Sequence, residues 1–104
     1  MRYELTGPNK ALTVDDSGIH IKSDPFKEER FIPFRSVLSV SVRKPAMAMV
    51  GYIFFQTAGA SDPLGGGDPD KIGSAVSFKK QEQYDIALQI MGELEKILSG
   101  GGVA

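Results

Sequence analysis

The sequence has 104 residues and contains no cysteine, no tryptophan and a single histidine. Without cysteine the chain forms neither a disulfide framework nor a thiolate zinc site, and it has no cysteine nucleophile. His20 has no second histidine or cysteine with which to share a metal ion, and its place between two isoleucines predicts that it points outward from a strand. No strand–turn–helix motif presents an activated serine. The sequence therefore predicts no enzymatic activity, no cofactor and no metal.

An excess of charge of one sign is also lacking. The chain has 12 Lys+Arg against 13 Asp+Glu, for a formal net charge of -1 at pH 7, whereas nucleic-acid-binding domains usually carry a strongly basic face. No apolar run approaches the ~20 residues of a membrane-spanning helix, and residues 1–4 do not resemble the start of a secretory signal peptide. We therefore expect a cytoplasmic protein that binds no nucleic acid. We expect one domain over residues 1–98 and a flexible glycine-rich tail over residues 99–104.

Hydrophobic and polar residues alternate through most of the first three quarters of the chain, which is the period of strands with one buried face. Strands are expected at residues 3–5, 12–14, 19–22, 30–34, 36–44, 50–56 and 72–78. The Asp-Asp-Ser-Gly sequence at residues 15–18 predicts a tight turn, and Pro33 marks the edge or the end of a strand. In segment 36–44 the alternation places Leu38 on the buried face together with Val40 and Val42. Segment 50–56 does not alternate, which favours a strand buried on both faces and contacted by the helix that ends the chain.

From residue 81 to residue 98 the hydrophobic period changes to 3.6, which predicts a helix. At 100° per residue its apolar side chains cover an arc of roughly 200°, whereas packing on one layer needs only ~100°. One flank of this arc carries Ile86, Ile90 and Ile97, and the remainder carries Tyr84, Leu88, Met91 and Leu98. If the second group covers the core, the three isoleucines stay partly uncovered and offer a surface for self-association. The flanks could also be reversed, or neighbouring strands could cover the whole arc.

Two methionines, Met47 and Met49, stand in the connection between two expected strands. The flexible thioether side chain suits either an irregular gap in the core or a binding surface, and both alternatives stay open. If they form a surface, they are candidate contacts for a protein or peptide partner, together with the three isoleucines of the helix.

The densest basic neighbours are the pairs Arg43-Lys44 and Lys79-Lys80. At about 1 kcal/mol per basic group near an anionic membrane, one pair contributes about 2 kcal/mol. A dissociation constant of 1 mM already needs about 4.1 kcal/mol. Binding to lipid head groups therefore requires that folding bring both pairs to one rim, with Arg35 or Lys22. A membrane surface is the alternative partner on these grounds.

Residues 58–70 are rich in glycine and predict a loop. Asp62, Asp68 and Asp70 leave a weak, incidental cation site as an alternative. Ile72 and Lys79, however, stand at positions where a calcium-binding loop requires oxygen ligands.

Four segments taken in order resemble a family of bacterial pleckstrin-homology-like (PH-like) domains of unknown function. They are Gly-Ile-His-Ile-Lys at 18–22, the isoleucine–proline segment within 31–40, Gly-Tyr-Ile-Phe-Phe at 51–55 and Val-Ser-Phe at 76–78. The resemblance implies a mainly β fold, a partly open barrel of about seven antiparallel strands capped by a C-terminal amphipathic helix. It also implies a binding or assembly module without catalytic residues, with an exposed barrel edge as a second route to a peptide. PH domains that bind phosphoinositides gather lysine and arginine in the first turn between strands, where this chain has the acidic turn 15–18.

Overall fold

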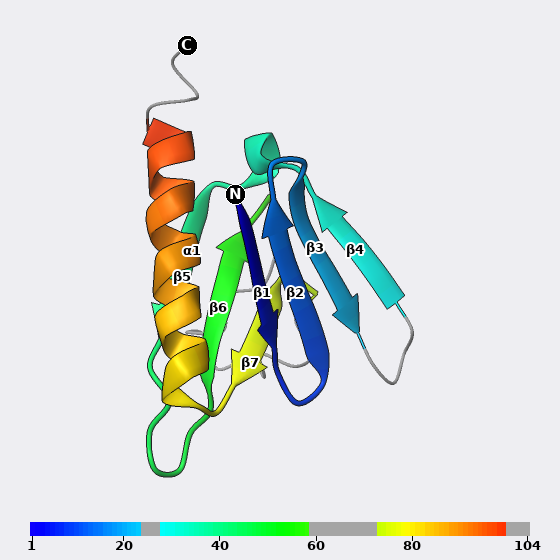
Figure 1. Cartoon of the computed structure of the whole chain (residues 1–104). Helices are drawn as coiled ribbons and strands as arrows, with labels where there is room; N and C mark the ends of the chain where they lie inside the picture. Colours follow the sequence, from blue (N-terminus) through cyan, green and yellow to red (C-terminus); the bar gives the residue numbers. More distant parts are fainter. Residues whose placement is uncertain (24–27, 59–72, 100–104) are drawn as a thin grey trace.

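Two antiparallel β-sheets and a C-terminal helix make up the computed structural model, which describes residues 1–23, 28–58 and 73–99 (Figure 1). The first sheet has the order β1-β2-β3-β4 and the second has the order β5-β6-β7. The elements are β1 Arg2–Thr6, β2 Lys10–Asp15, β3 Gly18–Ser23, β4 Glu28–Ile32, the 3-10 turn η1 Phe34–Ser36, β5 Ser39–Arg43, β6 Gly51–Gln56, β7 Ala75–Phe78 and the helix α1 Gln81–Ser99. The expected mainly β class with one C-terminal helix is confirmed.

The first sheet is a meander whose inner face forms much of the core. Leu5 of β1 pairs with Leu12 of β2, and Val14 of β2 pairs with Ile19 of β3, and all four are buried. The predicted turn at residues 15–18 joins β2 to β3. It ends at Gly18, whose φ of 143° is a conformation that other residues rarely adopt.

The connection between the sheets corrects the prediction for Leu38. Strand β4 ends at Ile32, because Pro33 cannot donate a ladder hydrogen bond. The chain then makes the short turn η1, in which the Val37 amide donates to the Phe34 carbonyl at 3.1 Å. Strand β5 begins only at Ser39, so Val37 is buried and Leu38 is 67% exposed. Leu38 therefore does not belong to the core, because the turn shifts the side-chain alternation that the sequence pattern assumed.

Strand β6 is the central strand of the second sheet and is buried on both faces, as its sequence predicted. Ile53 and Phe55 belong to the main core cluster, which includes buried residues of α1. Tyr52 and Phe54 point the other way and form a second, smaller cluster with Ala75 of β7. Helix α1 contacts β6 and, more extensively, β5 and β1, so it spans the edges of both sheets.

This position of α1 corrects the assignment of its flanks. Ile90 is 0% exposed and belongs to the core with Ala87 and Leu94, so it cannot contact a partner. Leu88, expected on the core side, is 36% exposed. Ile86 and Ile97 are partly buried against the core. The helix needs its wide apolar arc because it lies across two sheet edges. Among the helices described, none has the length and apolar character to cross a bilayer.

One seam between the sheets is closed by contacts of Lys10, the first residue of β2, and of Gly7 in the β1–β2 connection with β7. The Lys10 ammonium donates a hydrogen bond of 2.8 Å to the Ala75 carbonyl. Gly7 lies so close to the Ser77 carbonyl that a Cβ atom there would overlap it. Within the described residues no ladder joins the two sheets, so they do not form a closed barrel. The loop aspartates Asp62, Asp68 and Asp70, Ile72 and the tail beyond Ser99 lie outside the described residues.

Candidate functional site

The connection between β5 and β6 extends beyond the body of the molecule as a narrow hairpin (Figure 1). Ala46 and Met49 form an isolated bridge. The Ala46 amide donates to the Met49 carbonyl at 2.9 Å, and the Met49 amide donates to the Ala46 carbonyl at 3.1 Å. This closure leaves Met47 fully exposed at the tip and Met49 more than half exposed. Of the two alternatives for these methionines, the structure therefore supports a surface position, since neither fills a gap in the core.

Arg43 braces the base of the hairpin. Its guanidinium donates to the Val50 carbonyl from Nη2 at 2.7 Å and from Nε at 3.2 Å. The same group lies 4.6 Å from the centre of the Tyr52 ring, in a cation–π contact. Gly51 allows the close approach of these segments, because a Cβ atom there would lie 2.5 Å from the Arg43 carbonyl oxygen. Arg43 thus acts mainly inside the hairpin, although it was one of the four candidate lipid contacts.

The two basic pairs come together beside this hairpin. Phe78, which precedes Lys79 and Lys80, pairs with Gly51 at the start of β6. The Lys80 carbonyl accepts a hydrogen bond of 3.2 Å from the Tyr84 amide, and the Lys44 ammonium lies 5.9 Å from the centre of the Tyr84 ring. The side chains of Lys44, Lys79 and Lys80 are exposed.

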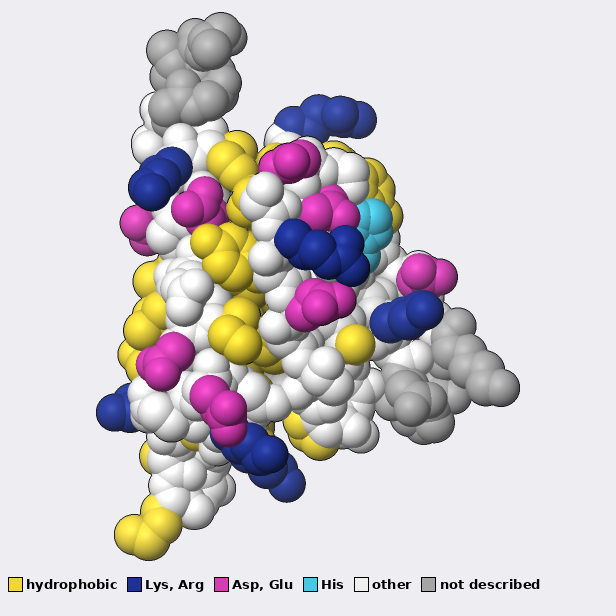
Figure 2. Space-filling view, in the orientation of Figure 1, with side chains coloured by type: hydrophobic (Ala, Val, Ile, Leu, Met, Phe, Trp, Pro, Cys, Tyr) yellow, Lys and Arg dark blue, Asp and Glu magenta, His cyan; other side chains and the backbone are white. Residues whose placement is uncertain are grey.

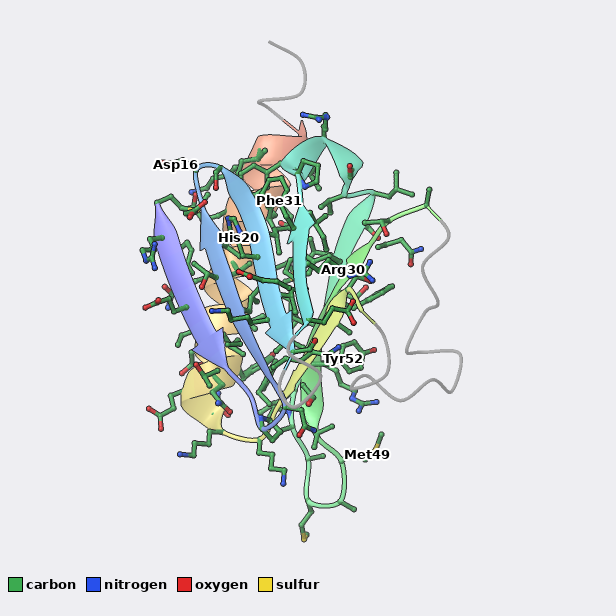
Figure 3. All side chains as sticks on the ribbon, turned by 90° about the vertical axis from the view of Figure 1, so that its right-hand side faces the viewer. Asp16, His20, Arg30, Phe31, Met49 and Tyr52 are labelled. Carbon is green, nitrogen blue, oxygen red and sulfur yellow. The ribbon has the colours of Figure 1, made fainter. Side chains whose placement is uncertain are left out.

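We call this end of the molecule the β5–β6 rim. Its residues are Arg43, Lys44, Met47, Met49, Lys79 and Lys80. Basic side chains lie on both sides of the hairpin at the lower end of Figure 2, and Figure 3 shows Met49 on the same hairpin. Arg35 does not join the rim, because η1 lies at the opposite end of the molecule (Figure 1). Lys22 lies on β3 in the other sheet.

Gln83 of α1 holds the Lys79-Lys80 segment in place. Its Oε1 accepts hydrogen bonds from the amides of Lys79 at 3.1 Å and Lys80 at 3.0 Å, which satisfies two amides at the start of the helix. Its Nε2 donates to the Thr6 carbonyl of β1. The acidic Glu82 is exposed in the first helical turn, where it offsets part of the lysine charge. This use of Gln83 was not foreseen from the sequence, although glutamine in the first turn is a known capping signal.

A serine, a histidine and an aspartate meet at the β2–β3 turn without forming a catalytic triad. The Ser17 hydroxyl donates to Asp15 Oδ1 at 2.5 Å, and the same hydroxyl lies 3.1 Å from His20 Nε2. His20 Nε2 is also the atom nearest Asp15, at 3.7 Å. In a triad the histidine stands between the other two and uses both ring nitrogens. Here the serine occupies the middle and its hydroxyl donates a hydrogen bond to the carboxylate, so His20 does not accept that hydrogen as the base of a triad would.

The Ser17 hydroxyl and amide, which both donate to Asp15, lower the pKa of that carboxyl below its ordinary value. His20 points outward as predicted and packs against Phe31, with ring centres 5.0 Å apart. Among the described residues, no group of three histidines or carboxylates could hold a metal ion.

The β5–β6 rim is the part of the described surface that joins exposed large hydrophobic residues to a cluster of lysines. Comparisons with family models, with curated proteins and with solved structures find no match to this chain. The geometry of the rim is therefore the basis for a functional argument.

Proposed function

We propose that this protein is a non-enzymatic binding module whose β5–β6 rim docks on an anionic membrane surface. The observation that supports this proposal is the position of Met47, fully exposed at the tip of a braced hairpin with Lys44, Lys79 and Lys80 at its base. An apolar tip enters the interfacial region of a bilayer while lysines at its base meet lipid head groups. The cytoplasmic location expected from the sequence would expose the rim to anionic leaflets.

The apolar contribution comes mainly from Met47. Complete burial of a methionine side chain is worth about 1.5–3 kcal/mol relative to full exposure. Met49 is more than half exposed and adds part of the same amount. Because Arg43 and the Ala46–Met49 bridge order the hairpin before it binds, little conformational entropy is lost on insertion.

The electrostatic contribution comes from the three exposed lysines Lys44, Lys79 and Lys80. At about 1 kcal/mol each near an anionic surface they supply about 3 kcal/mol, of which Glu82 removes a part. With the Met47 term the total is about 5 kcal/mol, which exceeds the ~4.1 kcal/mol of a millimolar dissociation constant. The expected binding is thus weak, reversible and sensitive to salt, since neither term alone passes that threshold.

The PH-like fold is part of this proposal. A four-stranded and a three-stranded antiparallel sheet followed by a C-terminal helix agree with the partly open, helix-capped barrel that the resemblance implies. A protein or peptide partner at the rim is the second candidate, favoured by the adaptability of Met47 and Met49. Self-association through α1 has weaker support, because only Ile86 and Ile97 of the three isoleucines reach the surface, and both are partly buried.

Vesicle co-sedimentation tests the proposal directly. The full chain is mixed with vesicles of phosphatidylcholine alone, or with about one third phosphatidylserine, at low and at high salt. We expect binding only to the anionic vesicles and a loss of binding at high salt, because screening weakens the lysine contacts.

Variants locate the surface. Lys44→Glu and Met47→Ser should each reduce binding about tenfold, the equivalent of ~1.4 kcal/mol. Two control variants lie outside the rim. Lys22→Glu makes the same charge change on β3, and Leu38→Ser removes an exposed hydrophobic residue at the other end of the molecule. Both should bind anionic vesicles as the wild type does. Equal binding to neutral and anionic vesicles, or equal losses in the rim and control variants, would refute the membrane proposal. If the wild-type chain binds neither kind of vesicle, the membrane proposal is wrong and a protein or peptide partner at the rim becomes the proposed function.

A further inference from the structure

The end of the molecule opposite the β5–β6 rim contains a second surface with a different chemistry. Pro33 ends β4, η1 carries the chain across to the second sheet, and β5 starts at Ser39. This crossing leaves a cleft of about 480 Å³, which we call the β4–β5 cleft, lined in part by Arg30, Phe31, Arg35, Leu38 and Thr57. Its volume lies within the range of ~300–1,000 Å³ that is usual for ligand sites.

The cleft combines apolar and cationic side chains. Phe31 and Leu38 are two of the large hydrophobic residues that the described surface leaves exposed, and both line it. Arg30 and Arg35 also line it, and none of the described residues that line it is acidic. Glu28 offsets part of the Arg30 charge. In a chain with a formal net charge of -1, the remaining positive charge of the two arginines at this cleft favours an anionic partner.

The two arginines differ in whether a described residue contacts their guanidinium groups. The Arg30 guanidinium lies against Gly73 and forms an exposed ion pair with Glu28, 3.8 Å from its Oε1. Arg35 is exposed on η1, and the structure gives it neither a hydrogen bond nor an ion pair with any residue of the described ranges. Arg35 is therefore available for a bidentate contact with a carboxylate.

The edge of β4 adds backbone hydrogen bonds to these side chains. Among the described strands, β4 pairs only with β3, so the outer row of its amides and carbonyls has no strand partner. Such an edge can accept an extended peptide as an additional strand, in which main-chain hydrogen bonds supply affinity and side-chain pockets supply specificity. Side chains of an added strand alternate between two directions, so an apolar residue and a carboxylate can be presented at neighbouring positions.

We propose that the β4–β5 cleft binds an extended acidic peptide segment by strand addition to β4, with an apolar side chain against Phe31 and Leu38 and a carboxylate on Arg35. This inference goes beyond membrane docking, because η1, whose residues line the cleft, lies at the opposite end of the molecule from the β5–β6 hairpin (Figure 1). A protein docked through the rim would present the cleft away from the bilayer.

The test uses a phage-displayed library of random twelve-residue peptides selected on the full-length wild-type chain. Enriched clones should combine net negative charge with apolar residues. Synthetic versions should bind Arg35→Glu about tenfold more weakly than wild type, since a charge-assisted contact becomes repulsive. Leu38→Ser should also weaken binding. Lys22→Glu, with the same charge change elsewhere, and Lys44→Glu at the rim should bind the peptide normally. Hydrogen exchange should show new protection in β4 when the peptide is bound.

Three results would overturn the proposal. They are a selection without enrichment, enriched peptides that have no acidic bias, and peptides that bind Arg35→Glu as tightly as wild type. If Arg35→Glu loses as much binding to anionic vesicles as Lys44→Glu does, the cleft contacts the membrane surface and not a peptide. Because the peptide assay contains no lipid, its failure leaves the result of the vesicle assay unaffected.

Discussion

Gly51 at the base of the hairpin provides a quantitative test of the packing that holds the β5–β6 rim in place. In Gly51→Ala the added Cβ would lie 2.5 Å from the Arg43 carbonyl oxygen, 2.7 Å from Phe78 Cε2 and 2.8 Å from Pro45 Cδ. Contacts below 3.0 Å are essentially never seen for real Cβ atoms, so the Arg43 carbonyl must move by at least 0.5 Å. That carbonyl belongs to backbone, which moves less easily than a flexible side chain.

Overpacking of this kind typically costs 1–3 kcal/mol, and we expect about 2 kcal/mol here. For a domain of about 100 residues each kcal/mol shifts the Tm by roughly 4–8 °C, so the Tm should fall by about 10 °C. Gly92→Ala in α1 is the matched control, because the Cβ meets nothing within 4 Å. Alanine in a helix interior is more favourable than glycine by up to about 1 kcal/mol, so this variant should raise the Tm by about 5 °C.

Thermal unfolding followed by circular dichroism measures both shifts. The displaced Arg43 carbonyl should also disturb the hairpin, so Gly51→Ala should bind anionic vesicles more weakly below its Tm. A Gly51→Ala protein with the Tm and vesicle binding of the wild type would show that the base of the hairpin tolerates displacement, and the argument that it is pre-ordered would fail. A destabilised Gly92→Ala protein would contradict the open space described at that position.

Three further predictions concern the core, the helix start and the β2–β3 turn. Ile90→Ala should lower the free energy of unfolding by about 2–5 kcal/mol, whereas Leu88→Ala should change it by less than about 1 kcal/mol, as measured by chemical denaturation. Gln83→Ala should cost about 1 kcal/mol in the same assay, because two amides at the start of the helix lose their acceptor. Ser17→Ala should raise the pKa of Asp15 towards its ordinary value in an NMR titration, and an unchanged pKa would contradict the hydrogen-bond assignment. Because the folded-state pKa is the lower one, the stabilisation from Asp15 is present above the unfolded-state pKa and is lost as the pH falls through the folded-state pKa. This loss occurs on the acid side of about pH 4.

Local sequence rules predicted most of the secondary structure because the signals lie within a few residues of one another. The turn at residues 15–18 and the helix from residue 81 depend on turn chemistry and on a sustained 3.6 period. The burial of β6 on both faces followed from its unbroken apolar run. The error at Leu38 arose where a three-residue 3-10 turn shifted the alternation, and no local pattern announces such a turn.

The error at Ile90 has a different origin. The sequence showed correctly that the apolar arc of the helix is wide, and it left open which surfaces cover that arc. The answer depends on the position of α1 across the edges of both sheets, where it contacts β1 and β5. Residues far apart in the chain determine this packing, so a helical pattern taken alone does not contain it.

The residue types that the chain lacks exclude several functions without reference to the structure. A chain with no cysteine, one histidine and balanced charge lacks the groups for a disulfide scaffold or a thiolate metal site, because those functions need particular side chains to be present at all. The candidate binding surfaces depended on the tertiary structure. Lys44 and Lys79 are distant in sequence and come together only because β5, β6 and β7 form one sheet, whose register places Phe78 beside Gly51. Composition determines which chemistry is available to the chain, and strand pairing determines which of those groups act together.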